Sequence, residues 1–128
     1  MKILGIGVDI IENKRIKSLI KNHKFKDRIY SPKELKQSAL SKDKIRYFSK
    51  RFAAKEAFAK ALGTGFRNNL NFKDIEIIND KLGKPYYAKT KKITKLIKKE
   101  FNVKSFNCFL SISDEYNYST AFTIIQSI

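Results

Sequence analysis

The feature that most constrains the fold is a stretch at 44–62 with the periodicity of a long helix. At about 100° per residue, five apolar residues share one arc: Ile45, Phe48, Phe52, Ala59 and Leu62. Ala53, Ala57 and Ala61, spaced by four, cover a different side, where small side chains permit another element to pack closely. The stretch ends at Gly63-Thr64-Gly65, a typical helix stop. We therefore expect a central helix that is buried on more than one face.

One carboxylate lies on the apolar arc of this helix. Glu56 falls beside Phe52 and Ala59 in the helical projection. A buried acid is costly unless it is paired or coordinates a metal. An ion pair with Lys60, four residues on, is the commoner arrangement on helices. Metal coordination is the alternative.

The N-terminal segment predicts a buried strand at Ile3–Ile11. One face carries the apolar residues Leu4, Ile6, Val8 and Ile10. The other face carries Gly5, Gly7 and Asp9, so a ligand or a helix could approach the backbone closely there. A carboxylate at the end of a buried strand suits Mg²⁺, which takes one or two protein carboxylates together with phosphate oxygens. A turn or cap formed by Asp9 is the alternative.

The rest of the chain mixes helices and strands without strict alternation. Ser31-Pro32-Lys33-Glu34 is typical of a helix start, and Thr90–Phe101 is an amphipathic helix. Four strands are expected at Asp74–Asn79, Tyr86–Ala88, Phe106–Ser113 and Ser119–Ile125, the last two joined by a hairpin. This order predicts an α+β fold in one domain, 1–128, whose small, mostly antiparallel sheet has its helices on one face.

The charge is strongly basic, with 28 Lys and Arg against 12 Asp and Glu, a net +16. Such an excess favours encounter with any acidic partner. A small nucleic-acid-binding module is therefore one hypothesis, but the aromatic residues fall mostly at core periodicity and no nucleic-acid-binding fingerprint is present. Most of the basic residues are Lys, in a pattern that AT-rich codon usage would also give. The sign of the charge alone does not identify a function.

Several site types are excluded by composition. His23 and Cys108 are the only residues of their kinds, which excludes a His-based triad, a zinc site and an internal disulfide. No apolar run approaches the roughly 18 to 20 residues of a membrane helix, and no signal-peptide pattern is present. We expect a cytoplasmic protein without membrane insertion. Glycines at 63 and 65 beside Lys55 and Lys60 could hold a phosphate, and a plain helix cap is the alternative.

Four motifs together resemble the holo-[acyl-carrier-protein] synthases, a family of small 4′-phosphopantetheinyl transferases. They are GIGVDIIE at 5–12, RFAAKEAFAKALGTG at 51–65, GKPY at 83–86 and LSISDE at 110–115. The segment 52–60 fits the core pattern of the superfamily throughout: an aromatic, a small residue, any residue, Lys-Glu, a small residue, two of any kind, then Lys. The order and spacing match over nearly the whole chain.

The resemblance implies a reaction and a set of site residues. The phosphopantetheine arm of coenzyme A would pass to a serine of apo acyl carrier protein in fatty acid biosynthesis, releasing adenosine 3′,5′-bisphosphate. Asp9 and Glu56 would hold Mg²⁺, which favours the metal role of Glu56 over the ion pair, and Lys60 would contact the transferred phosphoryl group. The remaining coenzyme A residues would be Arg51, Lys55, Gly63, Thr64 and Gly65, with Lys84 and Pro85 near the adenosine 3′-phosphate. A metal-bound water or Glu56 would be the base.

The resemblance also implies partners. The family forms a trimer with active sites between subunits, and acidic acyl carrier protein docks on the basic first helix and its continuation, which Arg15 and Arg28 match. This chain departs from the family at Asp114, where many members have His, and we expect Asp114 to point away from the diphosphate. A noncatalytic coenzyme A binder is a third hypothesis, against which the presence of both Asp9 and Glu56 argues.

Overall fold

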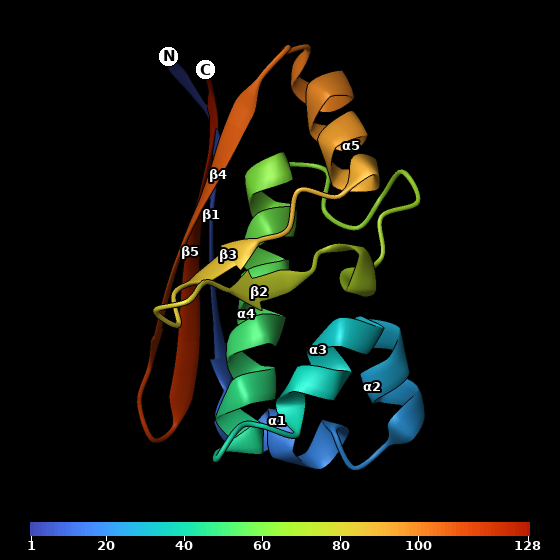
Figure 1. Cartoon of the computed structure of the whole chain (residues 1–128), viewed down its shortest axis with the longest axis vertical. Helices are drawn as coiled ribbons and strands as arrows, with labels where there is room; N and C mark the ends of the chain where they lie inside the picture. Colours follow the sequence, from blue (N-terminus) through green and yellow to red (C-terminus); the bar gives the residue numbers. More distant parts are fainter.

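The computed structural model describes residues 1–128 and has the predicted α+β architecture, arranged around one long central helix (Figure 1). In chain order the elements are β1 (Lys2–Glu12), α1 (Asn13–Leu19), α2 (His23–Ile29), α3 (Pro32–Ser38), α4 (Lys44–Leu62), the 3-10 turn η1 (Phe72–Asp74), β2 (Ile77–Asn79), β3 (Pro85–Tyr87), α5 (Lys91–Phe101), β4 (Phe106–Asp114) and β5 (Tyr118–Ser127). None of the helices combines the length and apolar composition that crossing a bilayer requires.

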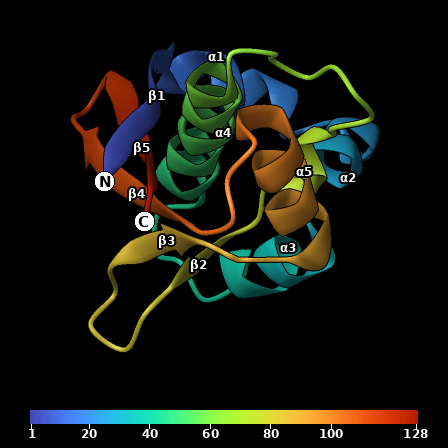
Figure 2. The same cartoon turned by 90° about the horizontal axis from the view of Figure 1, so that it is seen from above.

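The strands form two antiparallel sheets instead of the single sheet expected. The larger sheet has the order β1-β5-β4, and β2 pairs only with β3. Figure 2 shows the three-stranded sheet on one side of α4, with α2, α3 and α5 on the other side. The core lies on both sides of α4, which confirms that this helix is buried on more than one face.

Close packing of β1 on α4 follows from small residues on both elements. A Cβ atom added at Gly5 would overlap the carbonyl oxygen of Ala61, and one added at Gly7 would overlap that of Ala57. The two backbones are therefore closer than any larger residue would allow. This contact fixes the end of β1, where Asp9 lies, against the middle of α4.

The glycine-bearing face of β1 is the buried one, which confirms that a helix can approach the backbone there, but the apolar face of the predicted buried strand is exposed. Ile6, Val8 and Ile10 are 60%, 55% and 65% exposed. Val8 lies opposite Phe122 of β5, and Ile6 is level with Phe109 of β4. Helix α4 covers the glycine side of the strand and leaves the apolar side exposed. We call Ile6, Val8, Ile10, Phe109 and Phe122 the outer apolar face.

Most predicted boundaries are confirmed because local signals set them. Helix α4 spans Lys44–Leu62 and ends at Gly63, whose φ of +83° is left-handed. The Ser31 hydroxyl and the Glu34 carboxylate form a capping box at the start of α3. The strand expected at Asp74–Asn79 is shorter, because the Asp74 carboxylate accepts the Asn71 N–H at 2.9 Å and closes the turn η1.

Candidate functional site

The centre of the candidate site is formed where β1 crosses α4. The Lys60 ammonium donates to Asp9 Oδ1 at 3.2 Å and to the Val8 carbonyl at 2.9 Å. The Thr120 hydroxyl donates to the Asp9 carbonyl at 2.7 Å and ties this point of β1 to β5. Asp9 and Lys60, far apart in the sequence, are thus brought together as the family resemblance implied. The Asp9 side chain is 16% exposed, whereas that of Lys60 is 55% exposed and is open to solvent.

The Glu56 side chain makes no hydrogen bond or ion pair with any residue of the chain, and the predicted alternative of a Glu56–Lys60 pair is not formed. Burial raises the pKa of Glu56, and the nearby charge of Asp9 raises it further, against Lys60 and Arg15. Burial also raises the pKa of Asp9, opposed by Lys60 and by the charge of Arg15. The charge of Asp9 therefore disfavours ionisation of Glu56, both carboxylates are disfavoured by burial, and only Asp9 has a cationic partner.

This donor set fits a small divalent cation. Both groups supply hard carboxylate oxygens, and no cluster of three or more Cys, His, Asp or Glu side chains is present anywhere in the chain. Mg²⁺ commonly binds one or two carboxylates and completes its shell with water and substrate phosphate. A cation between Asp9 and Glu56 would offset the burial that raises both pKa values and the charge of Asp9 that raises the pKa of Glu56 further.

Lys55 is not part of this centre, and its predicted place in the coenzyme A site is wrong. Its ammonium is 0% exposed, and its three donors are used on Glu34 Oε1 at 2.7 Å and on the carbonyls of Phe72 and Ile75 at 3.0 and 2.5 Å. A Lys side chain has only three N–H donors. No donor is left for a phosphate.

Arg51 is also largely buried, but it faces a different segment. It is 5% exposed, stacks on the Tyr47 ring at 3.8 Å and donates from Nη2 to Asn79 Oδ1 at 2.7 Å, while its Nε has no partner. The Asn79 amide donates in turn to the Gly83 carbonyl at 2.9 Å. Arg51 is thereby connected to the turn that carries Lys84.

Lys84 and Pro85 open onto a groove of about 250 Å³ between β3 and β4. Its other lining residues include Tyr86 and two members of the outer apolar face, Phe109 and Phe122. The predicted coenzyme A residues are therefore divided: Lys60 lies at the carboxylate centre, and Arg51, Lys84 and Pro85 lie around the β2–β3 turn.

Gly63-Thr64-Gly65 forms a helix cap. The Gly63 N–H donates to the Lys60 carbonyl at 3.1 Å, and the Gly65 N–H donates to the Ala59 carbonyl at 3.3 Å. Both glycine amides are thus used within the chain, which favours the plain cap over a backbone phosphate cradle. A position of these three residues along coenzyme A stays a prediction.

Arg15 on α1 and Arg28 on α2 are both exposed. Arg28 borders a groove of about 400 Å³ that also includes Leu19, Lys24 and Phe25. Because Arg15 acts on the pKa of both Asp9 and Glu56, the first basic helix is adjacent to the carboxylate centre.

Other residues singled out from the sequence take ordinary places. The Asp114 carboxylate pairs with Arg46 at 3.4 Å, so the acid in place of the usual His has a partner within the chain. His23 is exposed at the start of α2, and burial raises the pKa of the half-buried Cys108 thiol to about 12. Sequence reasoning missed Asn79, and it assigned Glu34 only to a helix cap.

Comparisons with known proteins show the family and the fold. The family model of the 4′-phosphopantetheinyl transferase superfamily matches residues 5–121. A holo-[acyl-carrier-protein] synthase of Pelagibacter ubique is 60% identical over 126 residues, 98% of each chain. The crystal structure of such a synthase from Neisseria meningitidis superposes with a TM-score of 0.87 at 40% identity, over 98% of this chain and 99% of that one. The crystal structure of a Bacillus anthracis synthase in complex with CoA (3′,5′-ADP) superposes with a TM-score of 0.82 at 33% identity, over 100% of each chain.

Proposed function

The chain belongs to the holo-[acyl-carrier-protein] synthases of the 4′-phosphopantetheinyl transferase superfamily, and we propose that it uses Mg²⁺ to move the phosphopantetheine arm of coenzyme A onto a carrier serine, releasing adenosine 3′,5′-bisphosphate. The observation that carries this proposal is the pair Asp9 and Glu56, held together by the β1–α4 contact, with Glu56 lacking any partner in the chain. The related Bacillus anthracis protein was crystallised with CoA (3′,5′-ADP), which supports coenzyme A as the donor.

In the proposed reaction the carrier serine oxygen attacks the phosphorus that bears the pantetheine arm. A new P–O bond forms, the P–O bond to the adenosine bisphosphate breaks, and its electron pair leaves on the bisphosphate oxygen. Mg²⁺ held by Asp9 and Glu56 would neutralise the diphosphate and the charge that develops on the leaving oxygen. Lys60, which is open to solvent and now bonded to Asp9, can turn to a phosphoryl oxygen. Glu56 stays a candidate for receiving the serine proton, as the alternative to a metal-bound water.

The experiment that tests this function weighs the carrier. Apo acyl carrier protein is incubated with the enzyme, coenzyme A and Mg²⁺, and its mass is followed by mass spectrometry. A mass increase of one phosphopantetheine that EDTA abolishes supports the proposal, and an unchanged mass contradicts it. We assign the reaction to fatty acid biosynthesis in the cytoplasm, and both assignments stay predictions.

We place the acidic carrier protein against α1 and α2, and predict that Arg28→Glu raises the KM for the carrier about tenfold with little change in the KM for coenzyme A. Arg28 is exposed beside the α2 groove, so its reversal weakens attraction to an acidic surface without disturbing the core. Lys104→Glu, the same charge change at an exposed residue outside these helices, is the control. Equal increases of the KM for the carrier in both variants, or a wild-type KM for the carrier that does not depend on salt concentration, would argue against this docking surface.

We place the trimer contact on the outer apolar face. Exposed apolar patches of this kind mark interaction surfaces, and two of its residues line the groove beside Lys84 and Pro85. A neighbouring subunit on this face would therefore complete the coenzyme A site. We predict that Phe122→Glu converts a trimer into monomers in sedimentation equilibrium, whereas Tyr116→Glu, at an 84% exposed aromatic on the β4–β5 hairpin, leaves the trimer intact. A wild-type chain that sediments as a monomer would refute the contact.

A further inference from the structure

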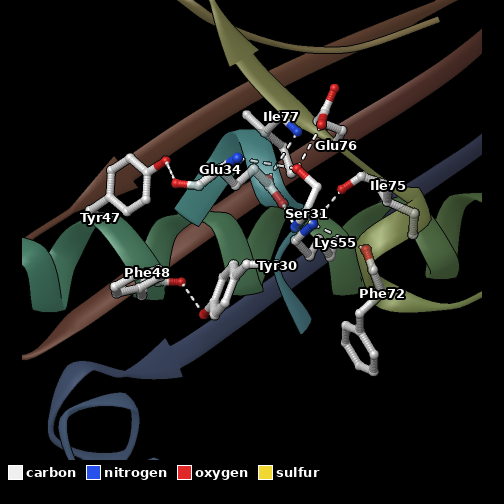
Figure 3. A network of polar contacts seen from close by, with 10 residues as sticks. All are labelled: Tyr30, Ser31, Glu34, Tyr47, Phe48, Lys55, Phe72, Ile75, Glu76 and Ile77. Carbon is white, nitrogen blue, oxygen red and sulfur yellow. Dashed lines mark hydrogen bonds and ion pairs between the residues drawn. The ribbon is translucent and has the colours of Figure 1, made fainter. Parts of the chain in front are cut away.

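The chain contains one fully buried ion pair, and it lies outside the carboxylate centre. Lys55 and Glu34 are both 0% exposed, with Nζ and Oε1 2.7 Å apart (Figure 3). Lys55 comes from the middle of α4, and Glu34 comes from the first turn of α3. A buried pair of this kind is costly to desolvate and is tolerated only when further hydrogen bonds satisfy both groups.

Those further bonds all go to backbone groups, one at the start of α3 and the others in the segment that leads into β2. Lys55 donates to the carbonyls of Phe72 and Ile75, and Glu34 accepts the N–H groups of Ser31 at 2.9 Å and Ile77 at 3.1 Å. Figure 3 shows these bonds meeting at one point between α3, α4 and the segment that leads into β2. The Ser31 hydroxyl adds a bond to the Glu76 carboxylate at 2.6 Å. The pair therefore fixes the start of β2 to α4.

The position of β2 matters because this strand carries Asn79. Asn79 accepts from Arg51 and donates to the carbonyl of Gly83, which precedes Lys84 and Pro85. A continuous path of hydrogen bonds and one short strand thus runs from the buried pair to the turn assigned to the adenosine end of coenzyme A. The Asp9–Glu56 centre does not depend on this path, because the contact of Gly5 and Gly7 with α4 sets it.

We infer that Lys55 and Glu34 are positioning residues for coenzyme A, which hold the β2–β3 hairpin with Lys84 and Pro85 at a fixed place relative to α4. The inference rests on the proposed function. In the helix, Lys55 and its neighbour Glu56 point about 100° apart. The two adjacent residues therefore have different roles: Lys55 holds the β2–β3 hairpin in place from the protein core, and Glu56 would bind Mg²⁺ with Asp9.

The test uses the full-length double variant Glu34→Gln/Lys55→Met. It removes both charges together, because removing one would leave the other buried without a partner, and a neutral pair of similar volume is often tolerated. We expect the KM for coenzyme A to rise about tenfold while kcat stays within about twofold, since the hairpin is displaced and the carboxylate centre is not. Asn79→Ala cuts the same path near the surface and is expected to raise the same KM even if the double variant does not fold.

Two controls separate positioning from a loss of stability. Ile97→Val removes a methyl group from a fully buried residue of α5, outside the path, and should lower the melting temperature without changing the KM for coenzyme A. Hydrogen exchange supplies a readout independent of activity: amides of β2 and β3 should exchange faster in the double variant, while those of β1 keep their protection.

The outcomes are distinguishable. An unchanged KM for coenzyme A in folded Asn79→Ala or in the folded double variant, or a fall in kcat alone, overturns the inference and leaves the transferase function standing. A wild-type protein that modifies no carrier overturns the proposed function. In that case the exchange of β2 and β3 still decides whether the buried pair holds the hairpin, and unchanged exchange refutes it.

Discussion

Replacement of Glu56 by Gln is expected to lower the rate of carrier modification by about 10²- to 10³-fold, the range typical for removal of one electrostatic group that acts on the transition state. The amide keeps the shape of the side chain but loses the charge that would hold Mg²⁺ together with Asp9. The rate is measured by mass spectrometry of the carrier at saturating coenzyme A, over a series of Mg²⁺ concentrations. The variant should also need more Mg²⁺ to reach half of its maximal rate.

The same substitution should not weaken the fold, which separates a functional role from a structural one. Glu56 has no partner in the chain, and its raised pKa means that ionisation costs folding free energy above the ordinary pKa of Glu. Gln removes that cost, so the melting temperature should be equal or higher. Glu100→Gln, at an exposed acid of α5, is the matched control and should change neither the rate of carrier modification nor the melting temperature. A Glu56→Gln enzyme within threefold of wild type would contradict the metal role.

Local signals explain which parts of the fold could be predicted from the sequence. Helix α4 was predicted with its observed ends because its periodicity is followed directly by Gly63. The alanines of α4 and the glycines of β1 face each other, and their small size allows the two backbones to come close. Each of the two motifs separately predicts close packing. The family resemblance then identified Asp9 and Glu56, which no spacing argument could have joined.

The errors have a physical reason as well. The glycines of β1 indicate which face a helix can approach, but they do not show that the opposite apolar face is left exposed, so the prediction of a buried strand fails on that face. Lys55 was assigned to a phosphate because its charge was considered alone, whereas its partner Glu34 lies 21 residues away and was explained by the helix cap. Lys60 is hydrogen-bonded to Asp9 of the adjacent strand β1 and not to Glu56, four residues earlier in its own helix. Helical spacing alone does not include partners on another element.

The β1–α4 contact is the feature on which both stability and site geometry depend, so Gly7→Ala is expected to lower the free energy of unfolding by about 3 kcal/mol, the upper part of the usual range for overpacking. The added Cβ would overlap the Ala57 carbonyl, which belongs to the backbone of α4 and cannot rotate away. The strand must move off the helix, which separates Asp9 from Glu56. Urea unfolding should show a lower midpoint with an unchanged slope, and carrier modification should be lost in the protein that remains folded.

Gly83→Ala tests whether this loss comes from the contact or from the general cost of replacing glycine. Gly83 has a φ of +87° with no atom within 4 Å of an added Cβ, so the change adds backbone strain without a clash. We expect a loss of only about 1 kcal/mol. Equal losses in the two variants would show that the close approach of β1 to α4 is not tight, and the geometry that joins Asp9 to Glu56 would then need another cause. A larger loss of stability in Gly7→Ala would show that the geometry of the candidate site depends on the contact between the glycines of β1 and the alanines of α4.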